Sequence, residues 1–251
     1  MPALTVVTGM VLSAMPVGDY DKRLVLLTKE IGKISVFAKG ARRPNSAFLA
    51  CSQPFAFGEF TLYAGRSSYN IMSCEISNYF PELREDIYSV YYGLYFCEFA
   101  DYMTKENNDE KDILKLLYQT LRAVAKKTIS LPLLRTIFEL KMVVVSGLAP
   151  QMFQCVKCDR SITGKEPTDY HFSAEYGGVL CEVCRYQDRS AIRLCTSTLY
   201  AMQYIVSSNI EKLYTFTVTE EVLTELTLCT RRYLDRHIDH DFKSLELIKT
   251  L

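Results

Sequence analysis

The sequence carries no net charge, no long apolar run and no targeting segment. Its 251 residues hold 29 Lys and Arg against 29 Asp and Glu. This balance excludes a uniformly basic nucleic-acid binder but allows a locally basic face. No stretch reaches the roughly 18 apolar residues that cross a bilayer, and Met1-Pro-Ala-Leu4 lacks the basic start and apolar core of a signal peptide. We therefore expect a cytoplasmic protein with no membrane partner.

The chain also lacks the common catalytic motifs. It has no GxxxxGK[ST] phosphate loop, no GxGxxG turn after a strand, no HExxH and no GxSxG. Of only three histidines, His237 and His240 have the i, i+3 spacing of a helical metal pair. We interpret them instead as charges near a helix end, where they complement the helix dipole. The sequence predicts no catalytic residue, no enzyme activity and no small-molecule substrate.

Cysteine is abundant, and four of the nine cysteines form two CxxC pairs. The pairs are Cys155-Val-Lys-Cys158 and Cys181-Glu-Val-Cys184, with 22 residues between them. Each pair can present two thiolates on one side of a tight turn, and two such turns make the tetrahedral sulfur site that Zn²⁺ prefers. Four thiolates leave no open coordination position, so we predict one structural Zn²⁺ per chain. The alternatives are unligated thiols or a redox pair.

The segment around these pairs is short and rich in turns. Thr163-Gly164-Lys165 and Gly177-Gly178 suit a ribbon or knuckle, and bound metal would supply the folding energy that so small a segment lacks. The five remaining cysteines lie in apolar runs, where cysteine acts as a small hydrophobic residue, and the odd total argues against a complete disulfide framework. These single cysteines are Cys51, Cys74, Cys97, Cys195 and Cys229.

Residues 1–80 have the pattern of a small β domain. Five short strands are expected, with one longer connection after the third, which fits a five-stranded barrel. The OB-fold is the leading candidate and an SH3-like barrel is the rival. Gly9 suggests a bend or bulge in the first strand. The expected strands are 5–13, 23–28, 33–39, 55–63 and 68–76.

Helical spacing replaces this pattern after Pro81. Apolar residues recur at i, i+3 and i+4 in five stretches, and Thr219 precedes the last of them as a plausible N-cap. We predict an α+β multidomain protein: an OB-fold nucleic-acid-binding domain, then a helical domain interrupted by a four-cysteine zinc-ribbon-like knuckle. The predicted domain boundaries are 1–80 for the barrel, 81–150 and 193–251 for the two parts of the helical domain, and 151–192 for the knuckle.

The balanced total charge hides a strong asymmetry. Residues 20–45 hold seven cations against two acids, whereas residues 81–115 hold nine acids against four cations. Cations at strand ends of a small barrel could bind backbone phosphates, although a solvated basic face is the alternative. Arg42 and Arg43 favour phosphate binding, because they lie in a Gly/Pro loop with no neighbouring acid. The candidate nucleic-acid-binding residues are Lys22, Arg23, Lys33, Lys39, Arg42, Arg43 and Arg66.

Aromatic residues in the same region allow two interpretations. They could stack on the bases of a single strand, or they could belong to the barrel core. We favour the core, because Phe37 lies on an apolar strand pattern. The acidic stretch likewise could be a solvated face, or it could repel nucleic acid and confine binding to the barrel. The aromatic residues concerned are Tyr20, Phe37, Phe48, Tyr63 and Tyr69.

Five segments carry a resemblance to a known family. They are GDYDKRLVLLT (18–28), EIGK (30–33), FAKGARR (37–43), QPF (53–55) and GGVLCEVC (177–184). In these residues, and in the order barrel, helices, cysteine knuckle, helices, the chain resembles the RecO family of bacterial recombination mediators. Asp19 departs from the glutamate usual in that family. The resemblance is strongest in residues 18–55 and 155–184.

The resemblance implies a function in DNA repair and recombination. Family membership would imply binding of single- and double-stranded DNA, annealing of complementary strands, and partnership with RecR and single-strand-binding protein so that RecA can load. Two alternatives stay open: a zinc-containing protein-interaction adaptor that binds no DNA, and a metal-dependent nucleic-acid enzyme.

Overall fold

The structure, a computed structural model, describes residues 4–65, 68–163 and 169–250. Contacts divide the chain into two compact units. Unit 1 comprises Met1–Lys127 and Phe242–Leu251, and unit 2 comprises Thr128–Asp241. Arg66 and the predicted turn residues Gly164 and Lys165 lie outside the described residues.

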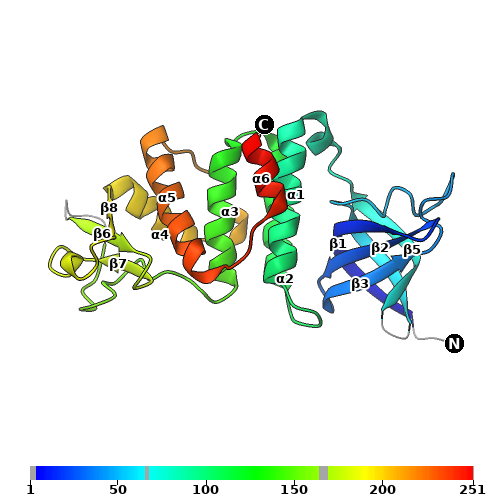
Figure 1. Cartoon of the computed structure of the whole chain (residues 1–251), viewed down its shortest axis with the longest axis horizontal. Coiled ribbons are helices and arrows are strands. Elements are labelled where there is room, and N and C mark those ends of the chain that lie inside the picture. The colour runs from blue at the N-terminus through cyan, green and yellow to red at the C-terminus, as the bar shows by residue number, and fades with distance from the viewer. Residues whose placement is uncertain (1–3, 66–67, 164–168, 251) are drawn as a thin grey trace. The chain divides into compact units, whose positions relative to one another are not determined.

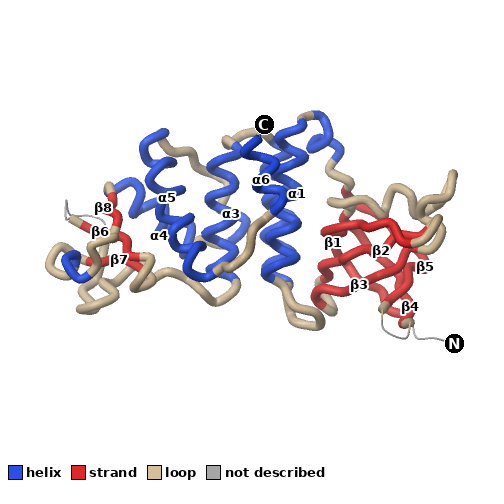
Figure 2. The backbone as a smooth tube through the Cα atoms, in the orientation of Figure 1, coloured by secondary structure: helices blue, strands red, loops and turns tan. Residues whose placement is uncertain are grey.

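A closed five-stranded barrel forms the first part of unit 1 (Figures 1 and 2). Its strand order is β1-β2-β3-β5-β4, with β3 and β5 parallel and the other described pairs antiparallel. This order, and the long connection after β3, confirm the predicted OB-type barrel over its SH3-like rival. The strands are β1 Leu4–Val17, β2 Asp21–Thr28, β3 Gly32–Ala38, β4 Phe57–Ala64 and β5 Tyr69–Asn78.

Alternation along the strands builds the barrel core. In β3, Ile34, Val36 and Ala38 are buried, while the residues between them point outward and are half-buried. Phe37 is one of these outward residues, so the expectation that it belongs to the core is wrong. Its apolar neighbours Val36 and Ala38 point to the opposite, inward face of the strand. Phe48 and Tyr69 do pack against the core.

Gly9 serves a close backbone approach, and the bend or bulge expected at this residue lies slightly further along β1. A Cβ atom at Gly9 would lie 2.6 Å from the carbonyl oxygen of Leu27 on the neighbouring strand. The irregularity in pairing between β1 and β2 falls slightly later, between Val11 and Ser13. The glycine therefore lets the two strands approach, and the bulge that follows bends β1 around the barrel.

Three helices complete unit 1: α1 Ile87–Met103, α2 Lys111–Lys126 and α6 Lys243–Thr250, with the short 3-10 helix η1 Pro81–Glu85 before them. Asp86 caps α1 by accepting from the backbone N–H groups of Tyr88 and Ser89 at 3.3 and 3.0 Å. The sequence pattern did not predict α6. It packs on α1 because Phe242 stacks on Phe99, with 4.7 Å between ring centroids, and because the Glu98 carboxylate accepts from the backbone N–H groups of Lys243 and Ser244.

The described part of unit 2 contains three α-helices, two short 3-10 helices and a small antiparallel sheet in the order β7-β6-β8. The predicted N-cap is confirmed, because the Thr219 side chain accepts from the Val222 N–H. Cys195, expected to be a small hydrophobic residue, is exposed and caps α4 instead, with its sulfur accepting from the Thr198 N–H at 3.4 Å. The elements are α3 Leu131–Val145, β6 Tyr170–Ser173, β7 Gly178–Leu180, η2 Arg185–Gln187, β8 Ile192–Leu194, α4 Thr196–Ser207, η3 Ile210–Lys212 and α5 Glu220–His237.

The compact units cut across the predicted helical domain. Helices α1, α2 and α6 belong to unit 1 with the barrel, whereas α3, α4 and α5 belong to unit 2 with the small sheet. The boundaries at 80, 150 and 192 stay predictions about domains that fold independently. Across the described ranges, every helix is too short or too polar to cross a membrane.

Candidate metal centre and nucleic-acid interface

Each CxxC pair lies on a tight turn that its own backbone closes. In the first, the Cys155 N–H donates to the Arg160 carbonyl at 2.8 Å and the Asp159 N–H donates to the Cys155 carbonyl at 3.0 Å. Asp159 has a φ of 57°, which turns the chain back sharply. In the second, the N–H groups of Cys184 and Arg185 both donate to the Cys181 carbonyl at 3.0 Å. The two thiols of each pair therefore face the same side.

Strand β7 brings the two turns together. Its Val179 N–H donates to the Gln151 carbonyl at 2.9 Å, and its carbonyl accepts from the Val156 N–H at 3.0 Å. The segment that carries the first pair thus runs along the strand that leads into the second. Gly178 permits this approach, since a Cβ atom there would lie 2.3 Å from the Gln151 carbonyl oxygen. The predicted Gly177-Gly178 turn former is therefore needed for close packing as well as for the turn.

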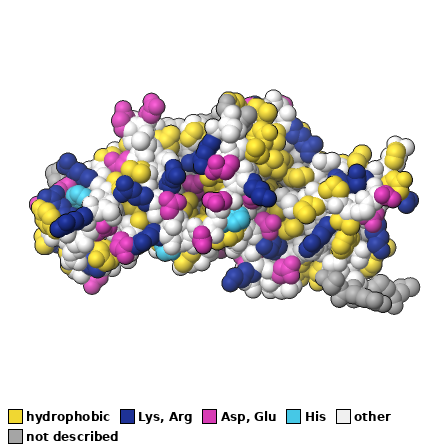
Figure 3. Space-filling view, in the orientation of Figure 1, with side chains coloured by type: hydrophobic (Ala, Val, Ile, Leu, Met, Phe, Trp, Pro, Cys, Tyr) yellow, Lys and Arg dark blue, Asp and Glu magenta, His cyan; other side chains and the backbone are white. Residues whose placement is uncertain are grey.

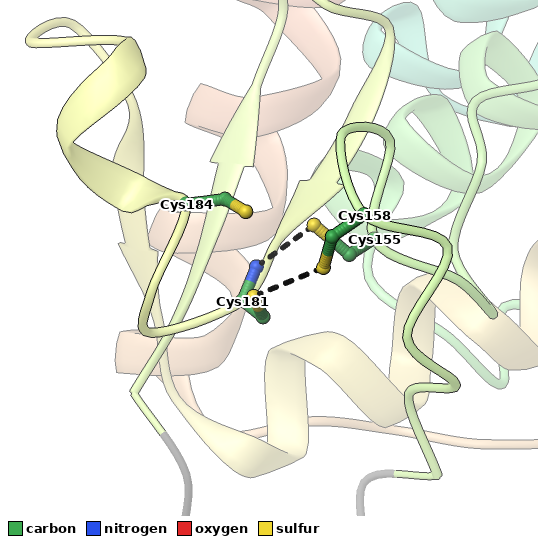
Figure 4. Close-up of side chains that lie close together, drawn as sticks. All are labelled: Cys155, Cys158, Cys181 and Cys184. Carbon is green, nitrogen blue, oxygen red and sulfur yellow. Dashed lines mark hydrogen bonds between the residues drawn. The ribbon is translucent and has the colours of Figure 1, made fainter.

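The four predicted ligands meet in one cluster (Figure 4). The sulfur atoms of Cys155, Cys158, Cys181 and Cys184 all lie within 4.8 Å of one another, and those of Cys158 and Cys181 are 3.6 Å apart. Tetrahedral zinc with Zn–S bonds of about 2.3 Å requires sulfurs about 3.8 Å apart, so the donor set fits this metal. Three of the cysteines are buried and Cys158 is exposed.

The electrostatics of the cluster suit a cation. Burial raises the pKa of Cys155, but the N–H groups of Cys181, Lys157 and Cys158 point at its sulfur and bring the pKa down to about 6. Burial and the neighbouring thiols raise the pKa of Cys184 to about 12. Several negative sulfurs so close together repel one another, and a bound dication removes that repulsion.

The histidines do not join the cluster. His171 lies on β6, and within the described part of the chain the metal-ligand grouping contains the four cysteines without it. His237 is the last residue of α5 and its ring contacts Tyr233, with 4.5 Å between centroids, while His240 lies beyond the helix end. The i, i+3 spacing of these two histidines is therefore not a helical pair.

A second feature lies at one end of the barrel, where the 18–21 turn meets the segment after β3. The Asp21 carboxylate accepts from the Gly40 N–H at 2.7 Å, and the Arg42 N–H donates to the Tyr20 carbonyl at 2.8 Å. The Arg42 guanidinium also donates to the Gly18 carbonyl at 3.2 Å. These bonds gather five of the predicted cations, which we call the barrel-end surface: Lys22, Arg23, Lys39, Arg42 and Arg43.

The five cations differ in their exposure and in their hydrogen bonds. Lys39, Arg42 and Arg43 are exposed. Lys22 is half-buried and its ammonium donates to the Ser52 carbonyl at 3.1 Å. Burial lowers the pKa of Lys22, and the nearby charge of Arg42 lowers it further. Arg23 lies on the outer face, where its guanidinium donates to the Ser35 hydroxyl at 2.8 Å.

Lys33 does not belong to this surface. It lies near the start of β3, whereas Lys39 follows the end of the strand, a separation of roughly 20 Å along an extended chain. Its ammonium is 2.9 Å from the Asp101 carboxylate on α1, and its side chain is only 18% exposed. An acid from the acidic helical stretch therefore pairs with this predicted DNA contact. Arg66 lies outside the described residues.

Apolar side chains missed by the sequence reasoning surround the barrel-end cations. Met15, Val17 and Leu49 are exposed there. Tyr20, for which the sequence analysis favoured the core, is instead 51% exposed, and the Arg43 guanidinium lies 5.1 Å from its ring centroid. Over the barrel, Figure 3 shows Lys and Arg side chains interspersed with hydrophobic ones. The pairing of β1 with β2 places Met15 opposite Arg23, so that an apolar and a basic side chain are neighbours on this surface. This arrangement could be recognised only once the register was known.

The fold and these sites define a class: multidomain proteins with an N-terminal OB-type barrel, a helical body and a four-cysteine cluster in the C-terminal part. Comparison with known families shows to which family the chain belongs. Residues 1–80 match the family described as recombination protein O N terminal, and residues 84–246 match recombination protein O C terminal. The chain belongs to the RecO family, as the sequence resemblance predicted.

Curated relatives are similar to this chain over almost its full length. The chain is 33% identical over 244 residues to the DNA repair protein RecO of Alkaliphilus metalliredigens, covering 97% of this chain and 98% of that one. It is 32% identical over 250 residues to the protein of the same name from Symbiobacterium thermophilum, covering 99% and 98%. These relatives extend the family match over nearly the whole chain.

Proposed function

We propose that the protein is a non-enzymatic recombination mediator that binds single- and double-stranded DNA through the barrel-end surface. The observation that carries the proposal is the set of exposed cations Lys39, Arg42 and Arg43, which have no ion pair with an acid among the described residues. Each cation that neutralises a phosphate releases condensed counterions, which favours binding at low salt.

Strand annealing follows from the same surface. Two strands approach one another more readily when their phosphates are neutralised, because mutual repulsion falls. Tyr20 is exposed beside Arg43 and is suited to stack on an unpaired base, since stacking tolerates any base. The surface therefore favours binding that depends on salt and little on sequence.

The four-cysteine cluster has a structural role in this proposal. Cys155, Cys158, Cys181 and Cys184 hold one Zn²⁺, and the metal supplies folding energy to a segment with short strands. Four protein ligands leave no position for a substrate or an activated water. DNA contacts are therefore assigned to the barrel and not to the metal.

Family membership supports the wider setting. The protein would act with RecR on strands coated by single-strand-binding protein and assist RecA loading indirectly, in the cytoplasm beside the chromosome. The named function of the curated relatives, DNA repair, supports this role.

The test replaces two arginines of the barrel-end surface. In Arg42→Ala with Arg43→Ala, affinity for a fluorescently labelled single strand should fall about tenfold or more at low salt. The slope of log K against log salt should flatten by about 1.4, because two phosphate contacts are lost. The matched control is Arg122→Ala with Lys126→Ala, which removes the same charge from exposed positions on α2. Equal affinities and slopes in the two double variants would remove the barrel end from the proposed function.

A protein-interaction adaptor without DNA binding is the second candidate. It is favoured by Val183 and Tyr186, which are 68% and 74% exposed beside the second CxxC pair. Exposed apolar side chains of this kind suit a protein partner. The same titration distinguishes the candidates, since an adaptor gives no salt-dependent binding to the labelled strand.

A further inference from the structure

Solvent reaches the four-cysteine cluster unevenly. Cys155, Cys181 and Cys184 are buried, whereas Cys158 is exposed. Cys158 stands at the outer end of the first turn, directly before Asp159, where the positive φ turns the chain back. Susceptibility of a cysteine to oxidation follows its exposure as well as its thiolate character. An oxidant dissolved in water therefore meets Cys158 before the three buried ligands.

The exposed sulfur has a buried sulfur at close range. The Sγ atoms of Cys158 and Cys181 are 3.6 Å apart, and a dashed line marks this contact in Figure 4. A disulfide bond is about 2.05 Å long, so the two sulfurs need to approach by only roughly 1.5 Å to form one. The Cys155 sulfur instead accepts from the backbone N–H of Cys181 at 3.4 Å. Cys181 is thus the ligand best placed to meet an oxidised Cys158.

Metal binding keeps the sulfurs in their reactive form. A thiol that coordinates a cation is deprotonated, and the thiolate is the form of cysteine that attacks an oxidant. Once it enters a disulfide, a sulfur is no longer a thiolate ligand. Oxidation and metal binding therefore exclude each other at Cys158 and Cys181. This reasoning rests on the proposed function, in which the cluster holds zinc.

We propose that the cluster is an oxidation-sensitive zinc switch, in which a peroxide links Cys158 to Cys181 and the metal is released. The Cys158 thiolate attacks one peroxide oxygen, the O–O bond breaks and hydroxide leaves, so that Cys158 becomes a sulfenic acid. The Cys181 thiolate then attacks the Cys158 sulfur, the S–O bond breaks and a second hydroxide leaves. Each hydroxide takes up a proton from the solvent and becomes water.

The electrons balance, and the coordination shell opens. The two sulfurs together lose two electrons, which the peroxide gains as it becomes two waters. Cys155 and Cys184 are then the remaining thiolates, too few for a closed tetrahedral zinc site. A thiol reductant reverses the reaction by attacking the disulfide through a mixed-disulfide intermediate, which returns both sulfurs to the metal.

Backbone anchors limit how far the change spreads. The side-chain amide of Gln203 on α4 donates to the carbonyls of Met152 and Ile162 at 2.9 and 3.1 Å, on either side of the first CxxC pair. These bonds need no metal, so they hold both ends of that segment on α4 after oxidation. The two turns that carry the sulfurs loosen, including the exposed Val183 between Cys181 and Cys184. The switch therefore acts on the surface where an adaptor would receive its partner.

The test treats the zinc-loaded full chain with hydrogen peroxide and follows zinc release with a chromogenic chelator. The remaining thiols are then blocked, and peptides are mapped by mass spectrometry without reduction. We expect stoichiometric zinc release together with a linked peptide pair that contains Cys158 and Cys181, and recovery of the zinc site after reduction with added zinc. Retention of zinc at a peroxide dose that oxidises the exposed Cys195 would overturn the inference, as would release with a link between another pair of ligands.

Two histidine variants separate the exposed ligand from a buried one. Cys158→His and Cys184→His each exchange one sulfur for an imidazole, which structural zinc sites also accept. Peroxide should release zinc from Cys158→His roughly tenfold more slowly than from the parent chain, because the exposed thiolate is gone. Cys184→His is the matched control and should form the Cys158–Cys181 link at the parent rate. Equal slowing in both would contradict the switch. If either variant fails to hold zinc, the peptide map of the parent chain decides.

Zinc content and DNA binding of the reduced chain distinguish this inference from the proposed function. A reduced chain without stoichiometric zinc overturns the structural zinc and the switch together. Stoichiometric zinc that peroxide leaves in place overturns the switch alone. A zinc-loaded chain that binds no labelled strand, yet releases zinc through the Cys158–Cys181 link, supports the switch and overturns the DNA-binding proposal.

Discussion

The barrel and the cysteine segment hold their shapes in opposite ways. The barrel strands run for seven to fourteen residues and bury an apolar face that includes Val36, Phe60 and Leu62. The strands β6, β7 and β8 have only three or four residues each. The barrel is therefore specified by alternation along many residues, whereas the cysteine segment has short strands and brings four sulfur atoms together. On the proposed function, bound metal supplies part of its folding energy.

This difference shows where each region is vulnerable. A core of many side chains loses a part of its stability when one of them is shortened. A four-ligand metal site loses most of its binding energy when one ligand is removed, because an unpaired position opens in a closed coordination shell. Substitutions of similar size should thus have graded effects in the barrel and nearly all-or-none effects in the cysteine segment.

The largest expected effect is that of Cys181→Ser. Structural zinc contributes on the order of 10 kcal/mol to the folding of small metal domains, so the variant should lose stoichiometric zinc and the protection of β6 and β7 from amide hydrogen exchange. Zinc content by elemental mass spectrometry and hydrogen exchange measure these losses. Cys195→Ser is the control and should keep its zinc. Equal loss of exchange protection in the barrel strands would contradict the contrast between the regions.

A smaller, graded effect is expected from Phe60→Ala in the barrel. Phe60 is fully buried, and truncating such a side chain leaves a cavity that lowers the free energy of unfolding by about 3–5 kcal/mol. Urea unfolding followed by circular dichroism measures the change. The zinc content should stay stoichiometric. Phe153→Ala, at a position 42% exposed, is the control and should change the free energy by less than about 0.5 kcal/mol.

The smallest effect is expected from Lys33→Ala. Its ion pair with Asp101 is partly exposed, so its loss should lower the free energy of unfolding by less than about 1 kcal/mol. DNA affinity should change less than twofold, because Lys33 lies away from the barrel-end surface. A drop in affinity as large as that of Arg43→Ala would show that nucleic acid reaches both ends of β3.

Much of the barrel could be predicted from the sequence, because its strands alternate and a long connection follows the third. The four cysteines could be predicted as one site, because their spacing is itself the geometric constraint. The predictions that were wrong concern residues whose positions depend on contacts between distant parts of the chain. Lys33 was grouped with Lys39 by charge, but the structure separates them along β3 and pairs Lys33 with Asp101.

Phe37 and α6 illustrate the same limit. An apolar run does not show which set of alternate residues in a strand faces the core. In β3, Phe37 belongs to the set that points outward. Helix α6 has only eight residues, which is too short a stretch for its apolar spacing alone to indicate a helix. It is fixed by the Glu98 carboxylate and by the aromatic rings of α1, which lie some 145 positions earlier in the chain. No local pattern could reveal those partners.

The return of the chain from unit 2 to α6 has a consequence for biosynthesis. The ribosome makes the barrel, α1 and α2 first, then all of unit 2, and only afterwards Phe242 and α6. Until then, the rings of Tyr95 and Phe99 lack only their contacts with Phe242 among the ring contacts described. The contacts of Phe242 and α6 with the aromatic rings of α1 can therefore form only after the whole of unit 2 has been synthesised.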